Sequence, residues 1–178
     1  RSFIGTRSFG NHPSKVALIA SSFARGMEEA GVLSTGKHFP GHGNIRGDSH
    51  KTLPLKNSTF SQLMTSDLMP YSIFLSNLKA SAVMVAHVAF PNIDKTLAPA
   101  TFSKPIINGI LRKHLNYDGM VITDDIEMAA TSGVGQFEER AVKAIEAGVD
   151  MVMVAWSRKA QRRAVHAILN SVKKGRIC

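Results

Sequence analysis

The sequence predicts an α/β fold built on a parallel sheet, and three observations support this prediction. Four short apolar segments are bounded by turn residues and begin near residues 32, 82, 120 and 149. A helical pattern follows each of them, which indicates repeated βα units and hence parallel strands. The last three segments are almost continuously apolar, as is typical of strands that helices cover on both faces.

The order and spacing of these units favour about half of an eightfold βα barrel. The predicted strands are 32–36, 82–86, 120–123 and 149–154. Their starts are spaced comparably to the roughly 31 residues per unit of a (β/α)8 barrel of ~250 residues. An open doubly wound sheet is the alternative, although no glycine-rich dinucleotide motif opens a helix. We therefore expect residues 1–178 to form one domain, the C-terminal half or so of a TIM-type barrel.

Amphipathic helices are predicted between the strands. The first ends near Gly31, and its predicted buried face consists of Val16, Ile19, Ala20, Phe23 and Met27. Residues 58–78 supply further helical material, which Pro70 is expected to divide. Later helices are expected after Ser103 and at Glu138, and the last carries Ala164, Val165, Ile168, Leu169 and Val172.

Composition and charge indicate an ordinary globular protein. Apolar residues make up 44% and charged residues 20%, and no run of 18 or more apolar residues is present. The single cysteine, Cys178, excludes a disulfide within the chain and a thiolate metal cluster. The formal charge is +9, but seven basic residues lie in the last 21 positions without interleaved aromatic residues. We therefore favour a solvated helix face over a nucleic-acid contact.

A polar loop follows the first predicted strand, where a parallel barrel places its reactive groups. It contains Lys37, His38, Asp48 and His50. An aspartate two residues from a histidine can accept from one imidazole nitrogen and leave the other for proton transfer. Two alternatives remain open: a metal site made by the histidines and Asp48, although the spacing matches no standard zinc signature, and a purely structural hydrogen-bonded loop.

Two adjacent carboxylates, Asp124 and Asp125, follow the third predicted strand. A carboxylate held at the barrel mouth can attack an anomeric carbon and form a covalent glycosyl ester. The alternative is that they cap the following helix. We assign the chemical role to Asp124 and a capping role to Asp125. His87, after the second strand, is interpreted as a hydrogen-bonded rim histidine rather than a catalyst.

Several motifs together resemble the bacterial β-N-acetylglucosaminidases of glycoside hydrolase family 3. The most specific is Lys-His-Phe-Pro-Gly-His-Gly at 37–43, followed by Asp-Ser-His at 48–50 and Leu-Pro at 53–54. The remaining motifs follow in the family's order, at 7–10 with Pro13, 86–88, 99–103 and 119–128. Asn44 and His114 depart from the family's usual residues, but neither belongs to the expected catalytic set.

The resemblance implies a retaining, two-step glycoside hydrolase without metal or cofactor. Asp124 would be the nucleophile, and His50, oriented by Asp48, would be the general acid and then the base. This departs from the usual pair of carboxylates, and a neutral imidazole avoids a second anion beside the covalent intermediate. The hydroxyls of the terminal sugar would be bound by Arg7, Lys37 and His38.

The resemblance also implies a substrate and a setting. The expected substrate is N-acetylglucosamine β-linked to anhydro-N-acetylmuramic acid, with or without peptide, in cytoplasmic peptidoglycan recycling. A phosphorylase on the same scaffold is the alternative, as is an inactive remnant. We expect no nucleic-acid or membrane partner and a monomer at full length. About three further strands precede the Arg7 motif in the family, so we expect the chain to be a fragment that is inactive or poorly soluble alone.

Overall fold

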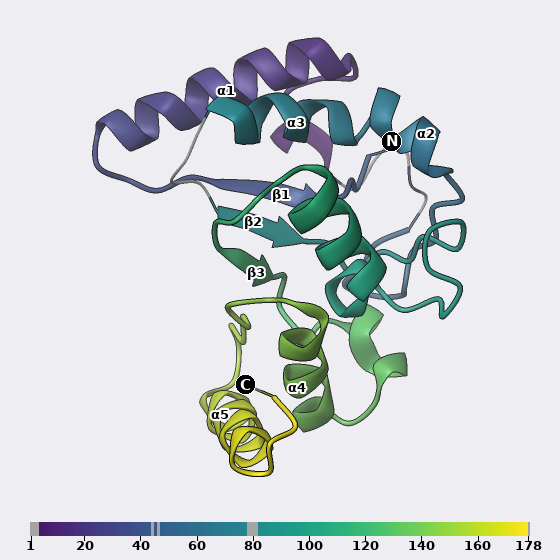
Figure 1. Cartoon of the computed structure of the whole chain (residues 1–178), viewed down its shortest axis with the longest axis vertical. Helices are drawn as coiled ribbons and strands as arrows, with labels where there is room; N and C mark the ends of the chain where they lie inside the picture. Colours follow the sequence, from purple (N-terminus) through teal and green to yellow (C-terminus); the bar gives the residue numbers. More distant parts are fainter. Residues whose placement is uncertain (1–3, 44, 46, 78–81, 178) are drawn as a thin grey trace.

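The sheet consists of three parallel strands in the order β1-β2-β3, which confirms the α/β class. The computed structural model describes residues 4–43, 45, 47–77 and 82–177. The strands are β1 (Thr35–Phe39), β2 (Ala82–Val85) and β3 (Val121–Thr123). In Figure 1 they lie side by side across the middle of the molecule. Their connections all contain helices, as parallel pairing requires.

The first strand begins three residues later than the sequence suggests. Val32 and Leu33, expected to be buried in a strand, are 53% and 63% exposed. β1 instead pairs with β2 from Thr35 to Phe39, and its register shifts between Lys37 and Phe39. The functional consequence is that Lys37 and His38 belong to the strand itself rather than to the loop after it.

The fourth predicted strand, 149–154, runs beside β3 without forming a regular ladder. Thr123 donates its backbone N–H to Met151 O (3.0 Å), and Ile126 donates to Met153 O (3.1 Å). The Met153 N–H, however, donates to the Thr123 side-chain oxygen (2.8 Å) and not to a backbone carbonyl. Because a side-chain oxygen takes the place of a backbone acceptor, only one parallel bridge forms here, between Ile122 and Met151, where continuous pairing was expected.

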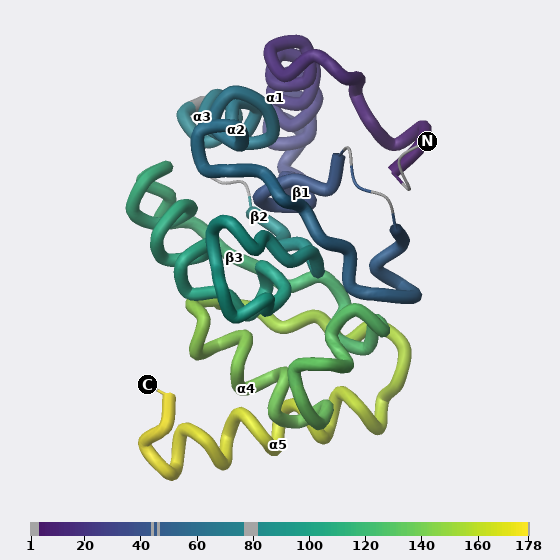
Figure 2. Tube along the Cα trace, turned by 90° about the vertical axis from the view of Figure 1, so that its right-hand side faces the viewer, coloured from purple at the N-terminus to yellow at the C-terminus, as the bar shows by residue number. Residues whose placement is uncertain are grey.

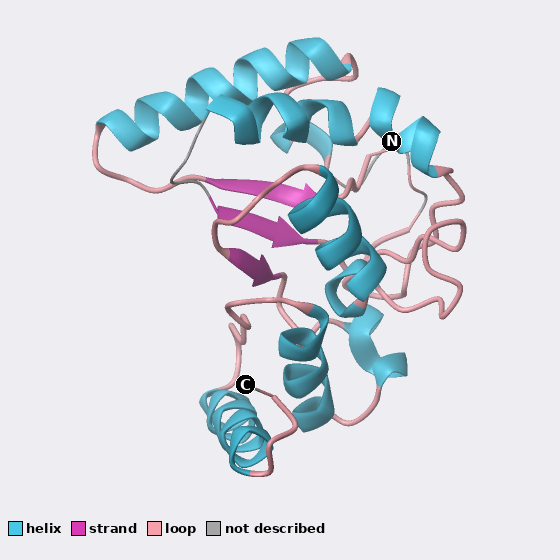
Figure 3. Ribbon diagram, viewed as in Figure 1, coloured by secondary structure: helices cyan, strands magenta, loops and turns pink. Residues whose placement is uncertain are grey.

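Helices lie beyond both edge strands of the sheet, β1 and β3. Figures 1 and 3 show α1 (Pro13–Glu29) and α3 (Leu68–Asn77) above it, and α4 (Phe137–Ala147) and α5 (Arg158–Lys173) below it. Figure 2, turned by 90°, again shows the strands between these two pairs of helices. The other helices are α2 (Phe60–Thr65), the π-helix η3 (Pro105–His114) and the 3-10 segments η1 (Gly5–Arg7), η2 (Ala100–Phe102) and η4 (Ala129–Val134).

The predicted buried face of the first helix is only partly right, since Val16, Ile19, Ala20 and Met27 are half-buried but Phe23 is not. Phe23 is 61% exposed, whereas Ala17, Ser21 and Ala24 are buried. These small residues recur at spacings of four and three, so they form one face that lets α1 pack closely on α3. The Phe23 ring lies on the outer surface and contacts Phe9, with the ring centroids 5.9 Å apart.

The division of the 58–78 segment also differs from the prediction. The helical material breaks between Thr65 and Leu68, and Pro70 lies inside the first turn of α3. A proline is tolerated there because the first-turn N–H groups have no partner within the helix. Thr59 begins α2 with a capping box, in which its side chain and that of Gln62 bond each other's backbone N–H.

The main core lies between the sheet and the helices that follow its strands. From the sheet it includes Phe39, Val83, Val85 and Val121, and from the helices Leu63, Ile106, Ile107 and Leu111. Gly148 ends α4 with φ +108°, as expected of a C-terminal glycine. A Cβ at this glycine would lie 2.5 Å from Asn108 Oδ1, so the position also requires close approach.

Part of the basic cluster at the end of the sequence pairs with α4. Arg163 of α5 forms an ion pair with Glu138, and Arg176 pairs with both Glu139 and Glu146. These contacts give two of the seven basic residues a role in packing α5 on α4. Within the part of the chain that the structure describes, no helix has the length and apolar character needed to cross a membrane.

Candidate active site

Asp124 lies directly after β3, where side chains from β1 and β3 meet above the end of β2. Its backbone N–H donates to Val85 O (3.2 Å), and its Oδ1 accepts from Asp125 N (2.8 Å). Its Oδ2 is 3.7 Å from Nε2 of His38 in β1. This is too long for a hydrogen bond, so the carboxylate is oriented mainly by backbone. The Asp124 side chain is 20% exposed and accessible to a ligand.

His38 is neutral at neutral pH. Burial lowers its pKa to about 4, and the Asp124 carboxylate opposes this shift without overcoming it. The positive charges of Lys37 and Arg7 also lower the pKa of His38, which places both within electrostatic reach of the imidazole. Arg7 and Lys37 therefore lie near His38, which is itself close to Asp124. That these three residues bind the sugar stays a prediction.

Asp48 and His50 form the predicted hydrogen-bonded pair. His50 Nδ1 lies 2.9 Å from Asp48 Oδ1, and the backbone N–H of His50 donates to the same oxygen (2.9 Å). The backbone N–H and the imidazole of His50 hold the pKa of Asp48 below its usual value. Because an ionised Asp48 can only accept, His50 Nδ1 carries a proton in this bond, and Nε2 is the nitrogen left for proton transfer. The His50 side chain is 54% exposed.

Hydrogen bonds connect the loop with Asp48 and His50 to the segment that follows Asp124. His42 is buried, and its Nε2 lies 3.3 Å from Ser49 Oγ. Ser49 O in turn accepts from the backbone N–H of Ala130, in the segment that follows Asp124. Burial lowers the pKa of His42, while the carboxylates of Asp124 and Asp48 both raise it, so His42 senses both charges. The alignment of His50 Nε2 with Asp124 stays a prediction.

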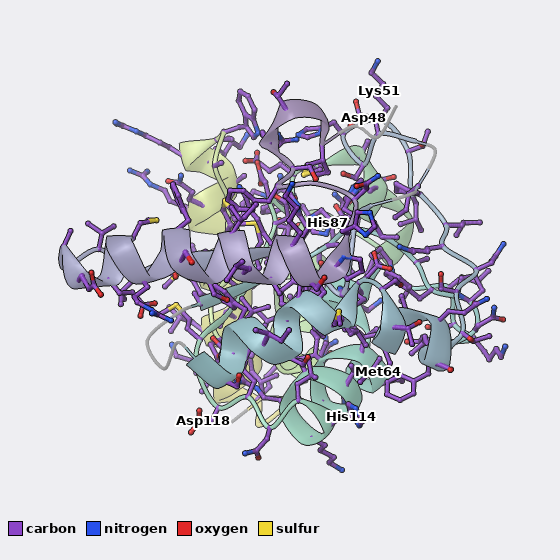
Figure 4. All side chains as sticks on the ribbon, turned by 90° about the horizontal axis from the view of Figure 1, so that it is seen from above. Asp48, Lys51, Met64, His87, His114 and Asp118 are labelled. Carbon is purple, nitrogen blue, oxygen red and sulfur yellow. The ribbon has the colours of Figure 1, made fainter. Side chains whose placement is uncertain are left out.

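His87 braces the segment that carries the two aspartates. It is 1% exposed and appears near the centre of the molecule in Figure 4. Its Nε2 donates to Asp125 O (2.9 Å), and its Nδ1 lies 2.8 Å from Thr101 Oγ1. Burial lowers the pKa of His87, so the ring is a neutral structural group. Asp125 Oδ1 accepts from Glu127 N (3.0 Å), a contact within the turn. The predicted capping role of Asp125 is wrong, because η4 begins after Met128 and has no side-chain cap.

Of the three histidines, His38 and His42 are in edge contact, with ring centroids 5.6 Å apart, whereas His50 is bonded to Asp48 on the loop. His38 faces Asp124, and His42 lies beside Ser49. Among the described residues, no group of three or more His, Cys, Asp or Glu side chains could hold a metal ion.

A groove of about 910 Å³ borders the loop on the side of Lys51 and Leu53. Its apolar walls include Leu97, Phe102 and Val134, and its lining does not include Asp124. Figure 4 shows Asp48 and Lys51 at the periphery, so this edge of the loop faces outwards.

Two features of the site were missed by sequence reasoning: the His42–Ser49 contact and a buried ion pair between Lys56 and Asp67. His42 and Ser49 are seven positions apart and Lys56 and Asp67 eleven, and none of the four lies in a helix or strand whose pattern could have predicted the contact. The only available signal was a lysine and an aspartate placed next to apolar residues, which is common on protein surfaces.

Three histidines with lowered pKa values, His38, His42 and His87, predict loss of stability in acid. The pKa of His38 is about 4 in the folded protein against 6.5 for a free histidine, and burial lowers the pKa of His42 and His87 too. Below 6.5 the unfolded chain binds protons that the folded chain does not, so the free energy of unfolding falls as pH drops towards 4. Urea unfolding at about pH 7 and about pH 5 measures how far the free energy of unfolding falls between them. This fall should be roughly 1–2 kcal/mol smaller for His38→Asn than for the unsubstituted protein. Equal losses would contradict this account.

Known proteins resemble this chain in both sequence and structure. A β-hexosaminidase of Idiomarina loihiensis is 42% identical over 155 residues, which are 87% of this chain and 46% of that protein. A glycoside hydrolase family 3 β-N-acetylglucosaminidase from Paenibacillus sp. str. FPU-7 superposes with a TM-score of 0.94 at 41% identity, over 98% of this chain and 33% of that one. The β-glucoside phosphorylase BglX superposes with a TM-score of 0.88 at 25% identity, over 97% of this chain and 32% of that one.

The chain spans about half the length of the curated relatives it matches. The glycosyl hydrolase family 3 N terminal domain matches residues 1–178. Because this family model covers the whole chain, the chain belongs to glycoside hydrolase family 3.

Proposed function

We propose that this chain forms the catalytic-site half of a retaining exo-β-N-acetylglucosaminidase. The observation that carries the proposal is the Asp48–His50 pair on a loop bonded, through Ser49, to the segment after Asp124. A carboxylate nucleophile and a polarised imidazole in one region supply the two groups that a double displacement needs. The three strands and the spacing of the units support about half of a (β/α)8 barrel, which further strands would close.

In the first step, Asp124 attacks the anomeric carbon and the bond to the leaving oxygen breaks. His50 in its imidazolium form gives its Nε2 proton to that oxygen, while ionised Asp48 stabilises the positive ring. The products are a glycosyl ester on Asp124 and a neutral imidazole. In the second step, Nε2 takes a proton from water, whose oxygen attacks the anomeric carbon and releases Asp124. Each step inverts the anomeric carbon, so net configuration is retained.

Arg7, Lys37 and His38 are proposed to hold the terminal sugar. Arg7 and Lys37 lie within electrostatic reach of His38, which is 3.7 Å from Asp124. The cationic side chains can donate to sugar hydroxyls, and neutral His38 can donate from one nitrogen and accept at the other. A neutral His38 also leaves the negative charge of Asp124 available for attack.

The proposed substrate is N-acetylglucosamine β-linked to anhydro-N-acetylmuramic acid from peptidoglycan. The resemblance of the 37–50 segment to enzymes of this kind supports it, as do the β-hexosaminidase relatives. The groove that Lys51 and Leu53 line begins one residue after His50 in the chain, and we propose that it receives a large leaving group.

A phosphorylase reaction is the second candidate. A neutral imidazole in place of a catalytic carboxylate would not repel phosphate, and the BglX phosphorylase shares the fold at 25% identity. The β-hexosaminidase relatives at about 40% identity favour water as the acceptor.

Product analysis tests the function. The test uses a full-length enzyme, defined as a polypeptide of the relatives' length that carries residues 1–178 as its matching segment. We expect a chromogenic β-N-acetylglucosaminide to give free N-acetylglucosamine with the β configuration at first release, with or without phosphate. A sugar 1-phosphate formed only with phosphate would favour the phosphorylase. Initial release of the α sugar would refute the double displacement.

A further inference from the structure

The loop that carries Asp48 and His50 is closed at its base by a buried lysine. Lys56 is 8% exposed, and its Nζ donates to Gly43 O (2.9 Å) and to Asp67 Oδ1 (2.5 Å). Gly43 lies before the loop residues and Lys56 after them, so the side chain of Lys56 joins the two ends of the loop. Neither His50 nor Asp124 is among the partners of Lys56 Nζ, which therefore takes no direct part in the chemistry proposed above.

Lys56 is itself held on two sides. Its backbone N–H donates to Ala89 O (2.9 Å), and Ala89 N donates to Pro54 O (3.0 Å). Leu55 forms a parallel bridge with Ala89, in the segment that continues β2 past His87. The end of the loop is therefore attached to the same rigid segment that supports the aspartates.

Asp67 fixes the ammonium group of Lys56 in this position. Its second oxygen, Oδ2, accepts from Ser66 Oγ (2.8 Å), so both oxygens are engaged. The backbone of Gly41 packs directly on this carboxylate, since a Cβ at Gly41 would lie 2.2 Å from Asp67 Oδ1. Asp67 thus contacts the start of the loop by packing and its end through Lys56.

We propose that Lys56, oriented by Asp67, is a positioning residue that sets the place of His50 by holding the base of the 43–56 loop. A charge-assisted hydrogen bond shielded from water is stronger and more directional than an exposed one. Because proton transfer requires His50 Nε2 within hydrogen-bond distance of the leaving oxygen, a small shift of the loop costs rate. This inference rests on the function proposed above.

The test is a double-mutant cycle in the full-length enzyme. Lys56→Met alone leaves Asp67 buried and unpaired, which can unfold the site. The principal variant is therefore Lys56→Met with Asp67→Asn, which removes both charges. We expect kcat to fall about tenfold on a substrate with a poor leaving group, with KM changed less than about twofold. Lys159→Met, at an exposed position of α5, is the matched control and should keep the parent kcat.

The same pair of substitutions is then made in a His50→Ala enzyme. If Lys56 acts through His50, the pair should lower the remaining rate by less than about twofold, because the group that it positions is gone. An undiminished tenfold loss in that background would overturn the inference. The inference would also be overturned if the Lys56→Met, Asp67→Asn pair left kcat unchanged in the enzyme that retains His50.

A third variant separates positioning from folding. Lys56→Arg keeps a donor for both Gly43 O and Asp67 and should restore part of the lost kcat. Thermal melting of each variant shows whether it is folded, and an Arg variant that is folded yet as slow as the charge-free pair would count against the inference. Failure of the proposed function is distinct, since His50→Ala alone would then turn over at the parent rate.

Discussion

Replacing Asp124 by Ala is expected to lower kcat on the order of 10⁴-fold, the largest effect of any single substitution in the chain. The side chain leaves the end of β3 and is oriented by the N–H of Asp125, with neutral His38 beside it. Without it no glycosyl ester forms. The fold should survive because the Asp124 side chain is partly exposed and supports no core contact. Steady-state rates with an aryl β-N-acetylglucosaminide measure the loss.

Azide distinguishes loss of the nucleophile from general damage. The small anion can enter the space left by the Asp124 carboxylate and attack from the same face of the sugar. Asp124→Ala with azide should therefore recover activity and give the α-glycosyl azide, by a single inversion. The matched control is Asp118→Asn, at an exposed carboxylate on the periphery in Figure 4, which should keep the parent rate. Near-normal turnover by Asp124→Ala without azide would show that the nucleophile is another residue.

Local features of the site could be predicted from the sequence, because each depends on residues close in the chain. Asp48 and His50 are two positions apart, so a tight turn suffices to join them. Asp124 follows an apolar strand, and its place at the end of that strand needs only the parallel topology. The expected helix cap at Asp125 did not form, because the chain makes a turn at Glu127 before η4 begins at Ala129.

Features that depend on tertiary packing could not be predicted. The hydrophobic pattern of α1 suggests that Phe23 is buried, but α3 approaches the face formed by Ala17, Ser21 and Ala24. Close packing of two helices rewards small side chains, and no pattern within α1 reveals that its partner comes so near. The predicted strand 149–154 does not form a regular ladder for a similar reason. The backbone N–H of Met153 donates to the Thr123 side chain instead of to a backbone carbonyl.

Replacing His50 by Ala is expected to lower kcat about 10²–10⁴-fold, the range typical of a general acid–base residue. The loss should depend on the leaving group. An activated aryl leaving group departs without a proton, so formation of the glycosyl ester on Asp124 should be slowed less than its hydrolysis, which still needs a base. Rapid mixing should then show a burst of released aryl alcohol followed by slow turnover. With a sugar leaving group, the first step should become rate-limiting and the burst should vanish.

Azide again identifies the step, with the opposite stereochemistry. An anion needs no deprotonation, so it should relieve the slow second step of His50→Ala and give the β-glycosyl azide, by two inversions. Asp48→Asn is the companion variant: it keeps an oxygen near His50 Nδ1 but removes the charge that stabilises the imidazolium, so it should show a smaller loss of kcat. An α-glycosyl azide from His50→Ala would mean that Asp124 is bypassed. An unchanged rate would place the acid and base on another residue, and the Asp48–His50 bond would then serve only to hold the turn.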